Sequence, residues 1–318
     1  MSVLVYTESD QGNFKKAALE AASYGKAVAE AMGTTLTAVT FKVNDASKLG
    51  EYGVDKVLNI ESINDFNALI YADAIKQAAE KENTTVVIVS ASADSKYIAP
   101  LLAVGLSAGY VPNVVATPSS LNPFTVKRTA FTNKAFCNTE ISTPIKIVGV
   151  SNNSFGLVEK NAAAQIEAFT PDLTTSSTSV TSIDKANDKV TIADAEVVVS
   201  AGRGLKGPEN WGMIEELADV LGAATACSKP VSDLGWRPHS EHVGQTGKPV
   251  ATNLYIAIGI SGAIQHLAGI NASKIKVVIN TDAEAPFFKA ADYGIVGDAF
   301  EVVPKLIEKL KVFKVQNA

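Results

Sequence analysis

One stretch of the chain, residues 242–267, places polar residues on both sides of an apolar run. A turn bracketed by Gly244 and Gly247 precedes the apolar run 254–260, and Ser261-Gly262 follows it before a helical pattern. A short β-rich run that ends in Ser-Gly and becomes helical predicts a strand, a turn and a helix in succession. Ser261 is therefore the predicted N-cap. The free amides of the first helical turn, together with the helix dipole, would hold an anion such as a pyrophosphate.

Two side chains that could reach such a ligand, Gln265 and His266, fall in the first turn of this predicted helix. A lone histidine on a helix is more often structural than functional, so the residue type alone leaves both interpretations of His266 open. His239 and His242 are separated by three positions, which invites a metal interpretation. The flanking proline and glycine predict a loop, however, and no third ligand is nearby, so the pattern disfavours a zinc site.

A second glycine turn, Gly202-Arg203-Gly204, follows the predicted strand 196–200 and precedes the predicted helix 210–221. Strand, glycine turn and helix in this order form the general geometry that holds a dinucleotide, although the spacing is not GxGxxG. Taken alone, Arg203 is equally consistent with a surface arginine in a turn. The chain suggests no Ser–His–Asp or Cys–His arrangement, and Trp211 and Trp236 are more typical of packing than of stacking on a ligand.

The composition limits the possible classes of protein. The chain has 318 residues, 47% of them hydrophobic and 19% charged, with a net charge of −5. These values are typical of a folded globular protein of about two domains and argue against a nucleic-acid-binding surface. No apolar run approaches the roughly 20 residues of a membrane span, and the N-terminus lacks the pattern of a signal or transit peptide. With only two cysteines and no CxxC pair, we expect a bacterial cytoplasmic location.

The first half of the chain alternates predicted strands and helices. Strands alternating with helices predict a mainly parallel, doubly wound sheet, because each crossover helix must cover one face of the sheet. Two consecutive strands at the end would add to that sheet, and no phosphate-loop signature occurs, so we expect an architectural role for this half. The predicted strands are 3–7, 35–41, 56–60, 84–90, 124–142 and 145–150, and the predicted helices are 14–32, 66–82 and 97–108.

A Ser/Thr-rich segment, 170–188, has neither a helical nor a strand period and predicts a linker. We therefore expect an N-terminal α/β domain over 1–184 and a second domain over 185–318. The second domain again alternates, with strands at 196–200, 254–260, 276–279 and 291–296 and a closing helix at 302–310. The predicted fold class is α/β, with two domains that are each a mainly parallel doubly wound sheet. Polar residues at its strand ends, including Asn280 and Asp298, should converge on one edge.

The sequence VGQTGKPVATNLYIAIGISGAIQHLAGI, at 243–270, resembles the flavin-binding segment of the electron-transfer flavoprotein alpha subunit. The stretches VSAGRGLK at 199–206, VIN at 278–280, AP at 285–286 and ADYGIV at 291–296 agree with it in the same order. The likeness is close over 195–305 and weaker but continuous through the first half, where 128–150 resembles the hairpin region of the family. The resemblance implies that the C-terminal domain is a Rossmann-like FAD-binding domain.

The same resemblance implies a function and its partners. The chain would be an electron carrier with non-covalent FAD, without a substrate of its own, in a heterodimer with a beta subunit. Flavin dehydrogenases, such as those acting on acyl-CoA thioesters in fatty acid β-oxidation, would donate electrons, and a membrane-associated quinone reductase would accept them. Neither nucleic acid nor insertion into a membrane is expected.

The resemblance also implies roles for particular residues. Arg203 would contact the flavin pyrophosphate, Thr246 the ring edge near N5, and His266 the pyrimidine end, where it would stabilise negative charge on the reduced ring. The full set of implied cofactor-binding residues is Arg203, Ser228, Lys229, Val243, Gly244, Gln245, Thr246, Ser261, Gly262, Ala263, Ile264, Gln265, His266, Asn280 and Asp298.

One position departs from the family pattern. Lys229 follows Ser228 where the family usually has an arginine that lies against the flavin. The positive charge is kept, but the planar guanidinium is lost, and this puts the tuning of the flavin in doubt more than its identity. Two other functions remain open at this point: an NAD-binding enzyme with a fold like that of deoxyhypusine synthase, and a nucleotide-binding module without a redox role.

Overall fold

The structure is a computed structural model that describes residues 2–317 except 64, 132, 161, 174–177, 179, 183–190 and 193. Contacts divide the chain into two compact units, one made of residues 1–130 and 136–185 and the other of residues 131–135 and 186–318. The predicted domain boundary, between 184 and 185, lies outside the described residues and stays a prediction. No helix among the described residues is long and apolar enough to cross a membrane.

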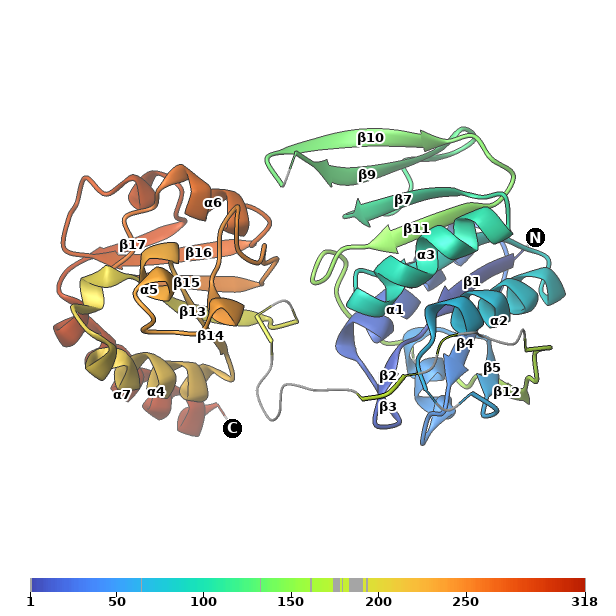
Figure 1. Cartoon of the computed structure of the whole chain (residues 1–318), viewed down its shortest axis with the longest axis horizontal. Coiled ribbons are helices and arrows are strands. Elements are labelled where there is room, and N and C mark those ends of the chain that lie inside the picture. Colours follow the sequence, from blue (N-terminus) through green and yellow to red (C-terminus); the bar gives the residue numbers. More distant parts are fainter. Residues whose placement is uncertain are drawn as a thin grey trace. The chain divides into compact units, whose positions relative to one another are not determined.

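The first unit is built on one sheet in the order β10-β9-β7-β11-β6-β1-β4-β5-β12, with β8 paired to β9 (Figure 1). The pairs from β7 to β12 along this order are parallel, whereas β7–β9 and β8–β9 are antiparallel. The strands are β1 (Ser2–Tyr6), β4 (Leu36–Phe41), β5 (Lys56–Ile60), β6 (Thr84–Ser90), β7 (Gly109–Val114), β8 (Ser120–Leu121), β9 (Phe124–Ala130), β10 (Ala135–Ile141), β11 (Lys146–Val150) and β12 (Gln165–Ala168), with a separate hairpin of β2 (Ser9–Asp10) and β3 (Asn13–Phe14).

Three helices cover the two faces of this sheet. The Ala-rich α1 (Lys16–Met32) packs on one face and ends at Gly33, whose φ of 63° is the left-handed conformation of a C-cap. On the other face lie α2 (Ala68–Lys81), capped by the Asn67 side chain, and α3 (Ala93–Gly105), capped by the Ser92 side chain. The buried strands therefore have apolar side chains on both faces, as a doubly wound sheet requires.

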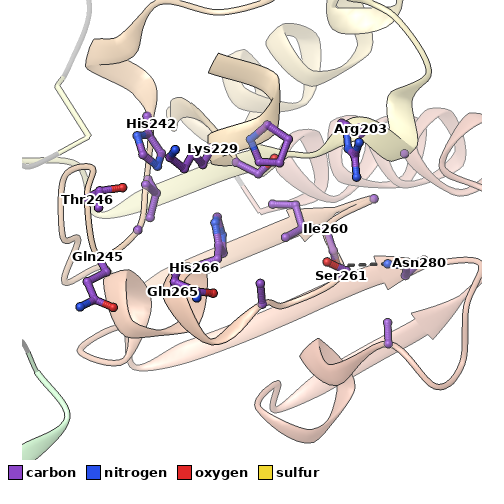
Figure 2. A pocket seen from close by; sticks show the side chains of 18 of the residues that line it. Arg203, Lys229, His242, Gln245, Thr246, Ile260, Ser261, Gln265, His266 and Asn280 are labelled. Atoms are coloured by element: carbon purple, nitrogen blue, oxygen red, sulfur yellow. Dashed lines mark hydrogen bonds between the residues drawn. The ribbon is translucent and has the colours of Figure 1, made fainter. Parts of the chain in front are cut away.

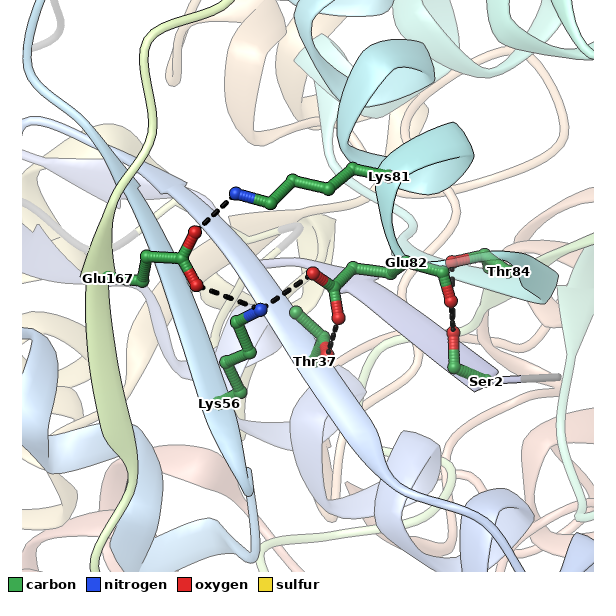
Figure 3. A network of polar contacts seen from close by, with 7 residues as sticks. All are labelled: Ser2, Thr37, Lys56, Lys81, Glu82, Thr84 and Glu167. Carbon is green, nitrogen blue, oxygen red and sulfur yellow. Dashed lines mark hydrogen bonds and ion pairs between the residues drawn. The ribbon is translucent and has the colours of Figure 1, made fainter.

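A network of charges fixes the edge of this sheet to α2 (Figure 3). Lys56 Nζ lies 2.7 Å from Glu82 Oε1 and 2.9 Å from Glu167 Oε2, and Lys81 also pairs with Glu167. The hydrogen bond to Glu82 is the main reason that the pKa of Lys56 is raised. Because Glu167 belongs to β12, the last strand of this sheet in the chain, two ammonium groups hold that edge strand in place.

The second unit holds an all-parallel sheet in the order β14-β13-β15-β16-β17. Its strands are β13 (Val197–Ala201), β14 (Ala224–Cys227), β15 (Leu254–Ile258), β16 (Ile275–Asn280) and β17 (Tyr293–Val296). The chain leaves β13 toward β14 on one side and returns to β15 on the other side. The order is thus 2-1-3-4-5, and its switch point lies between β13 and β15, where ligands of open α/β sheets bind.

Helices again cover both faces. Helices α4 (Gly212–Leu221) and α7 (Ala299–Gln316) bury one apolar cluster against the sheet. A second cluster, on the other face, includes Tyr255, Ile270 from α6 (Ile264–Ile270) and Phe287. A short α5 (Lys229–Asp233) follows β14, and the 3₁₀ helices are η1 (Ala46–Tyr52), η2 (Arg203–Leu205), η3 (Pro208–Trp211), η4 (His239–Glu241) and η5 (Pro286–Lys289).

The fold class predicted from the sequence is confirmed, because both sheets are mainly parallel with helices on both faces. Several predicted bounds were wrong. The first helix begins at Lys16 because Phe14 pairs in a hairpin, and the third spans Ala93–Gly105 because the Ser92 side chain caps it. Strands β7, β12 and β14 were not predicted. In the predicted linker, the described residues belong to neither helix nor strand.

Candidate functional site

A cavity of about 640 Å³ opens at the switch point of the C-terminal sheet (Figure 2). Its walls come from the loop after β13, the start of α5, the turn before β15, the loop after β15, the start of α6, and the end of β16 with the loop that follows it. A cavity of this size is typical of a small-molecule or cofactor site. It is lined by Arg203, Gly204, Ser228, Lys229, Pro230, His242, Val243, Gly244, Gln245, Thr246, Gly259, Ile260, Ser261, Ala263, Gln265, His266, Asn280, Asp282 and Ala285.

Two glycines let the loops after β13 and β15 cross at the carboxyl edge of the sheet. A Cβ added to Gly204 would lie 2.6 Å from Gly259 Cα, and Gly259 itself has a φ of 62°. The amide of Gly204 donates to the carbonyl of Gly259 at 3.2 Å. Only glycine satisfies both the left-handed backbone and this close approach, and the crossing brings the Arg203 turn directly beside the loop of Ser261.

The turn at 243–247 is held by backbone hydrogen bonds on both sides. Val243 N donates to Cys227 O at 3.0 Å, which ties the turn to the end of β14, and Gln245 N donates to Gln265 O at 2.8 Å, which ties it to α6. A Cβ on Gly269 would lie 2.6 Å from Gly244, so α6 also packs tightly against the turn. The exposed Thr246 side chain is thereby fixed at the rim of the cavity.

The expectation that Ser261 caps the helix was wrong. Helix α6 begins at Ile264 after Ala263, and no side chain caps it. The physical reason is the preceding turn: Gly262 has a φ of 84°, and Phe287 N donates to Ser261 O at 3.0 Å, so the backbone is still outside the helix there. With only seven residues, α6 gives little support to the predicted anion site at its first amides.

Most of the predicted site residues are brought together, and three are not. Twelve line the cavity: Arg203, Ser228, Lys229, Val243, Gly244, Gln245, Thr246, Ser261, Ala263, Gln265, His266 and Asn280. Gly262, Ile264 and Asp298 do not line it. Ile264 is 72% exposed, while the Asp298 side chain caps α7 by accepting from Phe300 N at 3.0 Å.

His266 is a buried, neutral group in the cavity wall. Its side chain is 6% exposed, and burial, helped by the nearby His242 and opposed by the backbone of Val243, lowers its pKa to about 4. Its Nε2 lies 2.9 Å from the hydroxyl of Tyr255, which is fully buried beneath it. Its Nδ1 is also buried and has no hydrogen-bond partner among the described residues. A ligand acceptor would satisfy that atom.

The predictions missed seven lining residues, most notably His242. The sequence drew attention to His242 only as a metal ligand. The structure places its ring in the cavity wall, 1% exposed, with a buried Nδ1 that has no partner within the described residues. Burial, the first cause, lowers its pKa. Its position directly before the glycine turn was the available signal. No group of three or more metal-binding side chains occurs in the described part of the chain.

Two cations stand at the exposed rim. Arg203 forms no hydrogen bond or ion pair within the described residues, so its guanidinium is available to a ligand (Figure 2). Lys229 Nζ lies 3.4 Å from Asp233, and both side chains are more than half exposed. The cavity thus offers a guanidinium, a close crossing of two glycine-containing loops, and two imidazole nitrogens without a partner among the described residues. These groups together fit a ligand with a phosphate group and a polar ring system.

Comparisons with known proteins also indicate a cofactor site in the C-terminal half, and the matches extend over nearly the whole chain. A family model described as electron transfer flavoprotein FAD-binding domain matches residues 191–271, and one described as electron transfer flavoprotein domain matches residues 3–174. The chain is 35% identical over 323 residues to the electron transfer flavoprotein subunit alpha of Bacillus subtilis, with 99% of each covered. It is 34% identical over 326 residues to that of Thermoanaerobacterium thermosaccharolyticum, with 98% of each covered. It is 34% identical over 308 residues to that of Pseudomonas aeruginosa, with 96% of this chain and 99% of the relative covered.

Proposed function

The chain belongs to the electron transfer flavoprotein alpha-subunit family, and on that premise we propose that it takes electrons from flavin dehydrogenases and passes them to a membrane-associated quinone reductase. It is an electron carrier with an FAD-binding domain rather than an enzyme with its own substrate. Acyl-CoA dehydrogenases are the donors that we favour. The observation that carries the proposal is the cavity at the switch point, because the matched FAD-binding domain contains most of its lining.

FAD is the group that exchanges electrons, and the protein binds and orients it. We assign the pyrophosphate to Arg203, because a guanidinium pairs with two phosphate oxygens and this one has no competing partner within the described residues. The flavin ring would lie between the glycine turn and α6, with Thr246 at its edge and His266 donating to it. Lys229 would supply a positive charge at the rim without the stacking surface of an arginine.

The partner that we propose is the beta subunit of such a flavoprotein. The floor of the cavity is buried, but Arg203, Lys229, Gln245, Thr246 and Gln265 at its rim are all exposed. A second chain that covers this rim would exclude water from the flavin and complete its site. A bacterial cytoplasmic location stays a prediction; both cysteines are free, as is usual in a reducing compartment.

To test whether the beta subunit is needed for FAD binding, the chain is expressed with and without a beta-subunit chain from the same organism. We expect about one FAD per heterodimer after gel filtration and much lower occupancy in the lone chain. Full, stable occupancy in the lone chain would refute the role of the partner in the flavin site.

The donor is tested separately with the FAD-loaded heterodimer under anaerobic conditions. A catalytic amount of acyl-CoA dehydrogenase and excess acyl-CoA should bleach its flavin absorbance, and acyl-CoA without the dehydrogenase serves as control. If the flavin stays oxidised with every dehydrogenase of this class that the source organism contains, the assigned donor is wrong, while the electron-carrier family is unaffected.

A further inference from the structure

The tautomer of His266 follows from its contact with Tyr255. Tyr255 lies in β15, is 0% exposed, and is not part of the cavity wall. Its hydroxyl is 2.9 Å from His266 Nε2. Burial raises the pKa of Tyr255 well above its ordinary value, so the hydroxyl keeps its proton. The only question is therefore which of the two groups donates in this hydrogen bond.

The surroundings indicate that the Tyr255 hydroxyl is the donor in this hydrogen bond. If Nε2 carried the imidazole proton, the Tyr255 proton would need another acceptor in a fully buried place. The candidate is the buried Ser200 hydroxyl, but Ser200 lowers the pKa of Tyr255, as a hydroxyl does that donates to the phenol oxygen and does not accept its proton. If the phenol instead donates to Nε2, both atoms are satisfied and the imidazole proton must reside on Nδ1.

The proton on Nδ1 then faces the ligand. Figure 2 shows the His266 ring rising from α6 toward the His242 and Lys229 side chains. Nδ1 is buried and forms no hydrogen bond of ordinary length among the described residues; the backbone of Val243, which also lines the cavity, favours a proton on the ring. An unpaired buried N–H is costly in the unliganded chain, and a carbonyl oxygen or ring nitrogen of a bound flavin would remove that cost.

We propose that Tyr255 is a positioning residue that fixes the Nδ1–H tautomer of His266 and so presents a neutral N–H donor to the flavin. This inference rests on the proposed function and deepens it. It specifies the role expected for His266: the residue stabilises negative charge on the reduced ring by donating a hydrogen bond and not by carrying a positive charge. Tyr255 itself touches neither the cavity nor the cofactor and acts through His266.

Nitrogen NMR tests the proposal on the chain with His266 and Tyr255 unchanged. The chain contains three histidines, so ¹⁵N-histidine labelling gives three imidazoles that single His→Gln variants assign. The labelled chain is combined with unlabelled beta subunit and FAD. We expect His266 Nδ1 to show the shift and coupling of a protonated nitrogen and Nε2 those of a bare acceptor. A protonated Nε2 in the loaded heterodimer would overturn the proposal.

Tyr255→Phe keeps the buried ring and removes only the hydroxyl. In this variant both tautomers become accessible, so His266 should show mixed nitrogen shifts, FAD should bind up to about tenfold more weakly, and the midpoint potential of the flavin should fall. Tyr293→Phe is the control, since that tyrosine is 66% exposed on β17. A Tyr255→Phe protein with wild-type nitrogen shifts and potential would refute the proposal even if it unfolds more easily.

The nitrogen measurement also separates this inference from the proposed function. If the chain bound no FAD with its partner, the proposed function would fail, yet the tautomer of His266 could still be determined in the FAD-free chain. If FAD binds and the proton resides on Nε2, the function stands and the role of Tyr255 is wrong.

Discussion

At the scale of single residues, Arg203 is the most direct contact that the structure offers a phosphate. Arg203→Ala should weaken FAD binding by about 1.5–3 kcal/mol, the usual worth of a hydrogen bond to a charged group. Arg203→Lys should recover only part of this loss, because an ammonium cannot pair with two oxygens at once. Fluorescence titration of the reconstituted heterodimer with FAD measures both affinities.

The matched control for Arg203 lies three residues away. Lys206 is 71% exposed and faces Asp298 and the Phe300 ring, outside the cavity. Lys206→Ala removes the same charge from the same loop and should leave FAD affinity nearly unchanged. Equal losses in both variants would mean that general electrostatic attraction, and not the guanidinium contact, is what Arg203 provides.

The buried histidines make the stability of the second unit depend on pH. The pKa of His266 is about 4 in the folded chain and about 6.5 when unfolded. Between pH 4 and pH 6.5, His266 is therefore protonated in the unfolded chain but neutral in the folded chain. Stability is therefore full above pH 6.5, falls as the pH drops toward 4, and then levels. The loss from His266 is at most about 3 kcal/mol, and His242, with its lowered pKa, adds to it.

Urea unfolding followed by tryptophan fluorescence measures this dependence, because both tryptophans, Trp211 and Trp236, belong to the second unit. His266→Gln should flatten the fall in stability between pH 7 and pH 5 in the FAD-free chain. His239→Gln, at an exposed position, is the control and should flatten it much less, because His239 acts only as a secondary cause of the lowered pKa of His242. An unchanged slope in His266→Gln would mean that His266 is not held neutral in the folded state.

Most of the residues predicted from the sequence line the cavity, and the failures of the prediction have physical causes. The glycine turn and the strand end drew attention to Arg203 and His266, whereas Thr246 was named through the family resemblance, and the roles of all three stay predictions. Ser261 was wrongly assigned as a cap, since an N-cap preference is worth only about 1 kcal/mol and the close contact between Gly262 and Phe287 holds the turn open. His242 and Tyr255 were not assigned to the site because their roles depend on burial, which no local pattern reports.

At the scale of elements, the crossing of the loops after β13 and β15 is the feature that shapes the cavity. In Gly204→Ala the new Cβ would lie 2.6 Å from Gly259 Cα, and backbone cannot give way as a side chain can. We expect a loss of about 1–3 kcal/mol in the stability of the second unit, the usual cost of overpacking, together with weaker FAD binding. Urea unfolding and FAD titration measure the two effects.

Gly212 provides the control for this substitution. It begins α4, and a Cβ there would meet nothing within 4 Å. Gly212→Ala should be neutral or stabilising by up to about 1 kcal/mol, because alanine favours a helix. If Gly204→Ala behaved in the same way, the two loops would have to be farther apart than the structure shows.

The charge network at the edge of the first sheet makes a separate prediction. Lys56→Met removes the cation that Glu82 and Glu167 share, and Glu82 is only 15% exposed. Leaving a partly buried charged group without its partner should cost about 1–3 kcal/mol. Lys76→Met, which breaks an exposed pair with Glu80 at 3.8 Å, should change stability by less than about 0.5 kcal/mol.

Both tryptophans belong to the second unit, so tryptophan fluorescence follows only that unit, whereas far-UV circular dichroism follows both. Comparing the two signals during urea unfolding gives the stability of the first unit. Equal effects of Lys56→Met and Lys76→Met would show that the network adds nothing beyond ordinary surface pairs.

Sequence patterns predicted the central strands better than the edge strands. The buried strands β1, β6 and β15 read as apolar runs, so composition alone identifies them. Strand β12 reads QIEA and is mostly exposed, and β14 reads ATAC, too short and Ala-rich to stand out. These two segments form strands because they pair with β5 and β13, which are distant in sequence. Local sequence patterns do not predict such long-range pairing.

At the scale of the whole molecule, we expect different tasks for the two units. The second carries the cavity, and the first carries a larger sheet without a phosphate-loop signature in its sequence. The family resemblance could be predicted from the sequence because its motifs recur in order over most of the chain, and the comparisons confirm it. The contribution of the proposed beta subunit could not be predicted in detail, because one sequence contains only one side of an interface.

The central claim is that the cavity between the Arg203 turn and the 243–247 turn holds the flavin. An experimentally determined structure of the FAD-loaded heterodimer tests it most directly. We predict the pyrophosphate within hydrogen-bond distance of Arg203 and the ring system beside Thr246, with a flavin acceptor atom within hydrogen-bond distance of His266 Nδ1. FAD bound anywhere else, or this cavity filled by side chains of the partner, would contradict the account.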